Sequence, residues 1–326
     1  MWIMRVVWVG FAVVLLGGCT PKKLLSATVS YTQLSDSAVG ELATVPGMVS
    51  EICVLRAQLE YMTVRVAGGA APTTFAEFFT KTESKIGLPG APTITWKQHC
   101  GGYRLADEAF EAGLGSIAAY GGALRAFATE DEAALQHAVV ISASVGTGTA
   151  ALSATAAPYQ DAITQLGTPV GQIADVVKQR WKAKKLRGLI DKVDPALQSA
   201  TKTLVEFVTV VKTRQVRDLR EALDILKDEL EEIRETTSPK GKMYKLDLVT
   251  AMMIDIEMSG RIVQMEQRLD ALAELLPQLA MAHAELRKGW DAGEDLGMDT
   301  IKAIGALSKT VHANVRAFQV AARSPQ

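Results

Sequence analysis

The sequence has few aromatic residues, little net charge and only three cysteines, and each shortage excludes a class of protein. Aromatic residues make up 6% of the 326 residues, which argues against a β-sandwich and against an enzyme that stacks sugars on aromatic rings. The chain has 35 basic and 36 acidic residues, so it carries no overall charge signal for nucleic acid. The remaining composition, rich in Ala, Leu, Val and Met, favours helices.

Motifs for catalysis and metal binding are also missing from the sequence. It has no serine nucleophile elbow, no Cys-His-Asn set and no Glu-x-x-His pair, and Gly146–Thr149 lacks the Gly-Lys-Ser/Thr ending of a phosphate loop. None of the four histidines pairs with another His or Cys at zinc-ligand spacing. We therefore expect no enzyme activity, no cofactor and no metal, and we interpret His283 as a hydrogen-bonded core imidazole.

Beyond the first twenty residues, no run is apolar enough to predict a membrane span. Within them, Arg5 precedes an apolar run from Val6 to Leu16, which is too short for a bilayer core of roughly 30 Å. Such a run followed by small residues is typical of an export signal. The sequence Leu16-Gly17-Gly18-Cys19 resembles the lipobox of bacterial lipoproteins. The alternative is an ordinary secretory signal, or a short membrane-anchoring N-terminus, in which Cys19 is incidental.

The lipoprotein resemblance covers only these residues, and it implies how the chain is attached. Residues 1–18 would be removed, and Cys19 would carry diacylglycerol on its sulfur and an acyl chain, such as palmitate, on its amino group. Several acyl chains make a stable anchor. The residue after the cysteine is Thr20 rather than Asp, which favours the bacterial outer membrane; the side that the body faces stays open.

The two other cysteines, Cys53 and Cys100, predict a disulfide, because an exported compartment is oxidising. The bond would tie a helix that contains Cys53 to a loop at 97–102. Closing a loop of this length stabilises a fold by roughly 4 kcal/mol in the entropic model. The alternative is two free thiols.

Turn and capping residues divide the chain into a tether at 19–30 and a helical bundle domain at 31–326, of which 31–102 would be the disulfide-stapled section. Thr74 and Glu77 form a capping box at a helix start. Asp107 is expected to complement the helix dipole near the start of a helix. The expected helices are 31–66 with a break at 46–47, a short one after 74, 103–128, 129–157, 195–235, 238–290 and one reaching 322.

Two of these helices carry heptad seams, which bury one stripe of a helix against a partner. The loop between them is short, and short loops join antiparallel neighbours. The sequence therefore predicts an all-α fold, an elongated antiparallel helical bundle with a long helical hairpin. The seam residues are Leu219, Leu223, Leu226, Leu230 and Ile233, then Ile262, Met265, Leu269, Leu272, Leu276, Leu279, His283, Leu286 and Trp290.

The segment 133–160 contains no Asp, Glu, Lys or Arg and is rich in small residues at near four-residue spacing. Such spacing lets helix backbones approach closely. We interpret it as a central helix packed within the bundle. The alternative is an element that enters a membrane, as in helical pore-forming proteins.

A basic run with an aromatic residue covers 178–192, with Asp191 as its opposing charge. A basic helix of this kind can bind anionic lipid headgroups or an acidic partner. The alternative is a solvated face that offsets the acidic run at 224–235. The candidate residues for binding an anionic surface are Lys178, Arg180, Trp181, Lys182, Lys184, Lys185 and Arg187.

These features together predict a lipid-anchored cell-envelope protein that acts through helix-surface contacts, as a scaffold, an adaptor or an interaction protein. Its partners would be the membrane, through Cys19, and a protein of the envelope. The alternative is a membrane-active bundle, pore-forming or curvature-binding, that uses 133–160 or 178–192. A homo-oligomer stays open because heptad seams pair within or between chains.

Overall fold

The structure, a computed structural model, describes residues 22–42, 47–68, 72–83, 94–129, 186–235, 245–292, 299–307 and 309–310. Nearly all of these residues are helical, and their β-structure is limited to one isolated bridge between Glu83 and Thr95. The predicted all-α class is confirmed.

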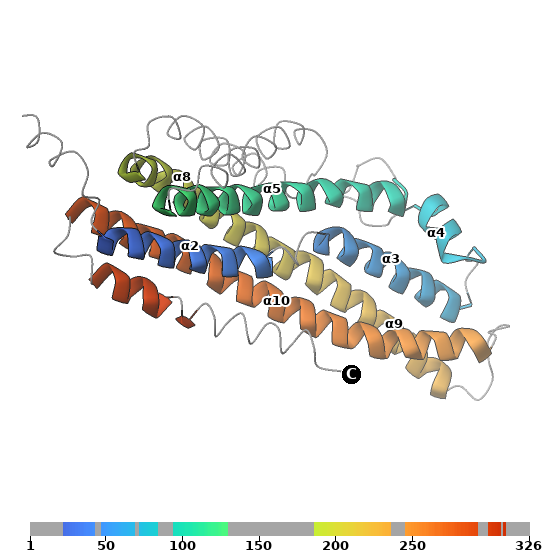
Figure 1. Cartoon of the computed structure of the whole chain (residues 1–326). Helices are drawn as coiled ribbons and strands as arrows, with labels where there is room; N and C mark the ends of the chain where they lie inside the picture. The colour runs from blue at the N-terminus through green and yellow to red at the C-terminus, as the bar shows by residue number, and fades with distance from the viewer. Residues whose placement is uncertain are drawn as a thin grey trace, which may run out of the picture.

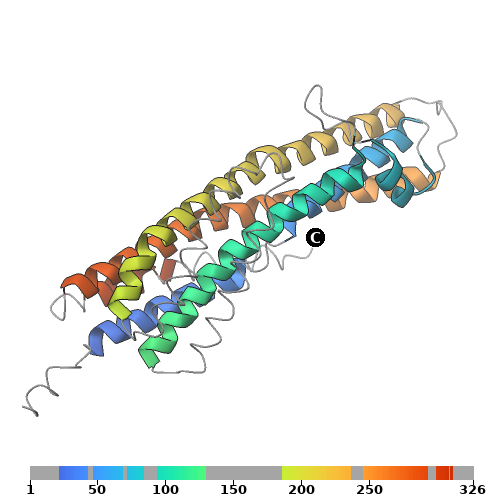
Figure 2. The same cartoon turned by 90° about the horizontal axis from the view of Figure 1, so that it is seen from above.

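The described helices pack as four columns of an elongated bundle (Figures 1 and 2). One column consists of α2 (Lys22–Leu42) followed by α3 (Met48–Val66), and α5 (Trp96–Thr129) packs along both. The third column consists of α8 (Leu186–Val210), the π-helix η1 (Val211–Val216) and α9 (Arg217–Glu235). The fourth is α10 (Lys245–Ala292), and the short helix α4 (Phe75–Lys81) lies at one end of the bundle.

The third and fourth columns form the predicted antiparallel hairpin. Along their contact, residue numbers rise on one column as they fall on the other, and α10 alone has 48 residues, about 70 Å of helix. The side-chain contacts that give this register are Arg187–Asp291, Asp194–His283, Gln198–Ala280, Lys212–Asp270, Arg220–Glu266 and Lys227–Asp255.

Most residues of the heptad seams predicted on this hairpin form its core, whereas Leu230, Ile233 and Trp290 are partly buried and pack against it. On α10 every predicted seam residue from Ile262 to Leu286 is at most 5% exposed, and on α9 Leu219, Leu223 and Leu226 are at most 2% exposed. Burying a Leu side chain contributes about 1.5–3 kcal/mol, so this stripe supplies much of the driving force for the hairpin.

The predicted tether at 19–30 is wrong for its larger part, because α2 begins at Lys22. Leu24, Ala27 and Thr28 are at most 1% exposed. Lys22, Lys23 and the small residues after them look like a linker, but the apolar residues among them lie on one helix face and pack against the bundle. The helix therefore starts three residues after Cys19.

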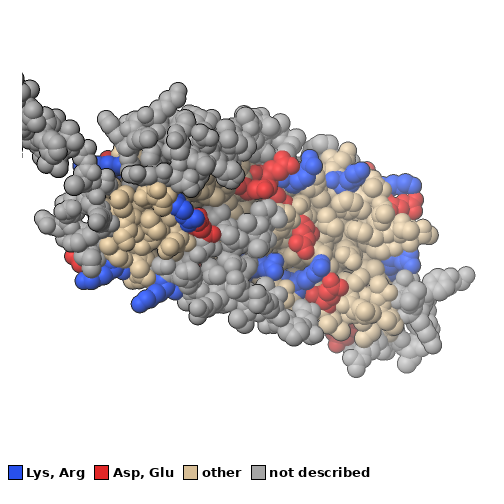
Figure 3. Space-filling model, in the orientation of Figure 1, with Lys and Arg blue, Asp and Glu red and all other residues tan. Residues whose placement is uncertain are grey.

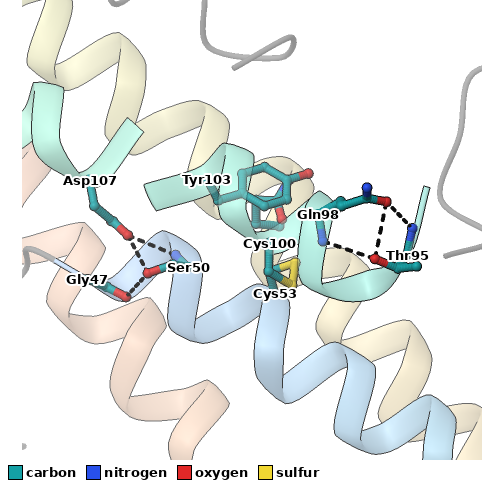
Figure 4. The surroundings of a disulfide bond; sticks show 9 residues. Gly47, Ser50, Cys53, Thr95, Gln98, Cys100, Tyr103 and Asp107 are labelled. Carbon is teal, nitrogen blue, oxygen red and sulfur yellow. Dashed lines mark hydrogen bonds between the residues drawn. A yellow bond between two sulfur atoms is a disulfide. The ribbon is translucent and has the colours of Figure 1, made fainter. Parts of the chain in front are cut away.

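The loop predicted at 97–102 is also wrong, because these residues are the first turns of α5 (Figure 4). The Thr95 hydroxyl accepts a hydrogen bond from the Gln98 N–H at 3.3 Å, and the Gln98 side chain accepts one from the Thr95 N–H at 3.0 Å. This pair is a reciprocal capping box. The cap and the burial of Trp96, Cys100 and Tyr103 together offset the low helix propensity of the two glycines at 101 and 102.

The start predicted at Pro195 is wrong as well, since α8 begins at Leu186 and continues through Pro195. Proline removes one helix hydrogen bond and crowds the preceding turn. Its neighbours Val193, Ala196 and Leu197 are at most 3% exposed, so tertiary packing outweighs that cost. From Pro195 to Glu235 the chain is helical as predicted.

Between α8 and α9, the π-helix η1 changes which side of the helix is buried. Val211 and Val216 are both buried, at 1% and 0% exposure, and they lie five residues apart. A π-turn brings residues five apart into line. It therefore lets the α8 face at Leu204 and Val208 continue into the α9 seam.

Candidate interaction surface

A disulfide and a carboxylate hold α3 against α5 (Figure 4). Cys53 is bonded to Cys100, as the sequence predicts. Two turns along α5, Asp107 accepts the Val49 N–H at 3.0 Å, the Ser50 N–H at 2.9 Å and the Ser50 hydroxyl at 2.6 Å. The expectation that Asp107 complements the start of its own helix is wrong, because α5 begins earlier; Asp107 caps the start of α3 instead.

A buried polar network lies between α5, α8 and α10. His283 Nδ1 lies 2.7 Å from Asp194 Oδ1, and His283 Nε2 lies 2.5 Å from the Tyr120 hydroxyl. Arg287 donates to the second Asp194 oxygen at 2.9 Å. His283 and Tyr120 are 0% exposed, so His283 is a hydrogen-bonded core imidazole, as predicted. We call these four residues the His283 network.

The protonation of the His283 network follows from its partners. The hydrogen bond from His283 and the Arg287 guanidinium hold the pKa of Asp194 at about 2, so its carboxylate only accepts. Burial lowers the pKa of His283 although Asp194 opposes that shift, so the ring is neutral. We therefore assign the proton to Nδ1, which donates to Asp194, while Nε2 accepts from Tyr120.

The His283 network has the Asp-His-hydroxyl order of a catalytic relay, but both His283 and Tyr120 are sealed inside the bundle. The network therefore fixes how α5, α8 and α10 pack. The sequence identified His283 but missed Asp194 and Tyr120, which lie 89 and 163 residues away along the chain. No local signal links them.

An exposed apolar stripe runs along the first third of α10. Each of its members exposes between 48% and 69% of its surface. At about 100° of rotation per residue, they occupy one side of the helix, opposite to the buried Ala251, Met258 and Ile262. We call them the outer stripe: Val249, Met252, Met253, Ile256 and Val263.

A groove of about 280 Å³ lies beside Val263, between α9 and α10. Ion pairs bridge the two helices there. Arg220 contacts both Glu266 oxygens at 2.7 Å, and Lys227 Nζ lies 3.6 Å from Asp255. The residues that line the groove are Arg220, Leu223, Asp224, Lys227, Ser259, Ile262 and Val263.

Acidic residues border the outer stripe. Asp255 and Glu257 flank Ile256 in the sequence and therefore lie at the two edges of the stripe. On α9, Asp228 and Glu231 are exposed. Residues 217–235 and 245–263 contain six basic and eleven acidic residues, a net charge of −5, and residues 236–244 add two lysines. Figure 3 shows uncharged surface next to red and blue clusters toward this end of the molecule.

The outer stripe and the start of α2 lie at opposite ends of the bundle (Figures 1 and 2). Trp290 Nε1 donates to Thr28 Oγ1 at 3.2 Å, so the last turn of α10 lies beside the second turn of α2. Val249 precedes Trp290 by 41 residues, about 60 Å along the helix.

The other predicted sites are tested only in part. Cys19, the segment 133–160 and the basic residues from Lys178 to Lys185 lie outside the described residues. Arg187 is described, in the first turn of α8, where it pairs with Asp291 at 3.0 Å. Its charge is partly neutralised, although its side chain is 59% exposed.

Within the described ranges, no group of three or more His, Cys, Asp or Glu residues could hold a metal ion. Nor is any helix among them long and apolar enough to cross a membrane. Comparison with family models, curated proteins and solved structures finds no match to this chain. The functional interpretation therefore depends on the sequence and the geometry above.

Proposed function

We propose that the chain is a lipid-anchored protein of the bacterial outer membrane whose helical body acts without catalysis, as an adaptor or scaffold. Cys19 is the attachment point. The bundle is a rigid spacer that holds the outer stripe away from the membrane, where a protein partner binds it.

The observation that carries this proposal is the position of the two ends. Lys22, the start of α2, is the third residue after Cys19, and even an extended chain spans only about 10 Å between them. The end of the bundle with α2 would therefore lie close to the lipid. The outer stripe lies about 40 to 60 Å away along α10.

A non-enzymatic role is supported by where the reactive side chains lie. In the described part of the chain, the one Asp-His-hydroxyl arrangement is in the His283 network, and its imidazole and hydroxyl, from His283 and Tyr120, are closed to solvent. The exposed end carries apolar and acidic side chains instead. Such a surface is suited to binding a partner.

The test is the substitution Cys19→Ser, with Thr20→Ser as the matched control. Membranes are fractionated and the intact mass of the protein is measured. We expect wild type and Thr20→Ser to carry the acyl mass and to partition with the outer membrane, and Cys19→Ser to lose both. A Cys19→Ser protein with unchanged mass shift and partition would refute the anchor.

A second candidate, membrane contact through the basic run 178–192, is favoured by one observation. The pairs Arg187–Asp291 and Trp290–Thr28 place the start of α8 at the same end as the start of α2, beside the proposed anchor. Charge reversal of Lys184 and Lys185 would then weaken binding to anionic vesicles. Unchanged binding would discard this role.

A further inference from the structure

We propose that the outer stripe of α10 is a docking site for a basic amphipathic helix of a protein partner. This inference rests on the proposed function and names the chemistry of the partner. Three observations carry it: the double-sided apolar character of α10, the methionines in the stripe and the acidic residues around it.

The first observation is that α10 is apolar on two opposite faces between 249 and 263. The inner face packs in the bundle, with Ala251, Met258 and Ile262 at most 2% exposed. The outer face is more than half exposed at Met253 (67%) and Ile256 (69%). The apolar face of a helix in a globular protein normally packs against another element. The described helices therefore leave the outer face of α10 uncovered.

The second observation is the shape of the exposed face. The stripe members recur at helical spacing, and Gly260 continues their line without a side chain. A second helix fits such a row, because its own apolar positions recur at the same spacing. Met252 and Met253 are flexible and polarisable, so they can adapt to the side chains of a partner helix.

The third observation, charge, decides between occupants. Asp255 and Glu257 lie at the two edges of the stripe, and Asp228 and Glu231 lie on the neighbouring helix. Asp255 and Glu257 already pair with Lys227 and Arg261, but the excess of acidic residues at this end would attract a partner helix with Lys or Arg beside its apolar face. A second copy of α10 would instead bring acidic residues against acidic residues, and an anionic lipid surface would be repelled.

The experiment measures binding of a synthetic peptide to the full chain. The protein is held in nanodiscs of zwitterionic phosphatidylcholine, or free in buffer if fractionation finds no anchor. The probe is a labelled Leu–Lys peptide with leucines at heptad spacing, read by fluorescence anisotropy. Two control peptides are used: a scrambled Leu–Lys peptide, and the heptad peptide with Glu in place of Lys.

The variants separate the stripe from the rest of α10. Met253→Ser with Ile256→Ser removes the most exposed part of the stripe, and Met281→Ser is the matched control, because Met281 is 50% exposed on the same helix but far from the stripe. We expect the double variant to bind the Leu–Lys peptide at least about tenfold more weakly, and Met281→Ser to bind like wild type. Asp228→Asn with Glu231→Gln should reduce the salt dependence of binding.

Several outcomes would overturn the proposal. If wild type and the double variant bind the Leu–Lys peptide with equal affinity, the stripe is not the binding site. If the Glu peptide binds as well as the Leu–Lys peptide, the charge argument fails. Self-association that the double variant abolishes would make a second copy the occupant. Stripe-dependent binding to anionic vesicles would make it a lipid surface. Each outcome is independent of the Cys19→Ser fractionation, so a failure here is distinct from a failure of the anchor.

Discussion

At the scale of residues, two buried tyrosines contact the His283 ring, but only one of them forms a hydrogen bond with it. Tyr31 and Tyr120 both pack edge-on against the His283 ring, at centroid distances of 5.4 and 5.3 Å. Tyr120 hydrogen-bonds to the ring, whereas the Tyr31 hydroxyl is buried with no hydrogen-bond partner among the described residues. Both hydroxyls are held neutral, because burial raises the pKa of each tyrosine.

The two tyrosines therefore give a matched pair of substitutions. Tyr31→Phe removes a buried, unpaired hydroxyl and should raise the free energy of unfolding by about 1 kcal/mol. Tyr120→Phe leaves the His283 Nε2 atom buried without a donor and should lower it by about 1–3 kcal/mol. Urea unfolding measures both values. Equal effects of the two changes would contradict the assigned hydrogen bonds.

The buried imidazole also predicts how stability depends on pH. Because the pKa of His283 is lower in the folded state than its ordinary 6.5, protonation favours the unfolded state. Stability from this residue is complete above about pH 6.5 and is lost as the pH falls. Burial and Arg56 lower the pKa of His99 as well, so it adds a slope of the same sign.

The variant His283→Gln tests this dependence, since glutamine can donate to Asp194 and accept from Tyr120 without titrating. We expect wild type to lose more stability than His283→Gln between about pH 7 and pH 5. Asp194 contributes in a separate window, because its pKa of about 2 is below the ordinary 3.8; its stabilisation is lost only as the pH falls below about 4. Parallel pH curves for the two proteins would contradict the account.

At the scale of elements, the disulfide and the Asp107 cap hold α3 on α5 at neighbouring points. Cys53 and Cys100 are 47 residues apart, so the bond constrains a long loop in the unfolded chain. Substituting both with Ser should lower the free energy of unfolding by about 4 kcal/mol in the entropic model. Unfolding in the presence and absence of a reductant measures it. A reductant that also destabilised the double Ser variant would point to another cause.

The sequence predicted the elements whose signals are local. On α9, Leu219, Leu223 and Leu226 recur at alternating steps of four and three residues, and this periodicity identified the seam. The short loop between the two seams identified the hairpin. The helix start predicted at Thr74 is confirmed, since Thr74 Oγ1 accepts the Glu77 N–H at 3.2 Å, while the Glu77 carboxylate pairs with Lys81. The capping box of Thr95 and Gln98 is equally local, but it was not recognised. The predicted start of α5 at residue 103 was therefore too late.

The remaining errors have tertiary causes. Proline at 195 predicts a helix start because its local cost is large, but packing of its neighbours overrides that cost. Asp107 interacts with Ser50, 57 residues away, which no local pattern reveals. The outer stripe was not predicted, although its apolar residues from Val249 to Val263 recur at helical spacing. Its exposure could not be predicted, because the sequence does not say which of two apolar faces of one helix finds a partner.

At the scale of the whole molecule, the described bundle is elongated and its two ends differ. One end holds the start of α2 and the last turn of α10, joined through Thr28 and Trp290. The other end holds the outer stripe and the acidic part of α9. The proposed function requires the bundle to hold the lipid anchor and the binding site apart, and the continuous helices α5 and α10 run along it between the two ends.

The central claim is tested most directly by measuring how far each end lies from the membrane. A dye is placed at Met253 or at Lys288 through an unnatural amino acid in the full chain, bound to vesicles that contain an acceptor lipid. These positions lie about 50 Å apart along α10. The account predicts strong energy transfer from position 288 and little from position 253. Equal transfer from both positions, or none from either, would contradict it.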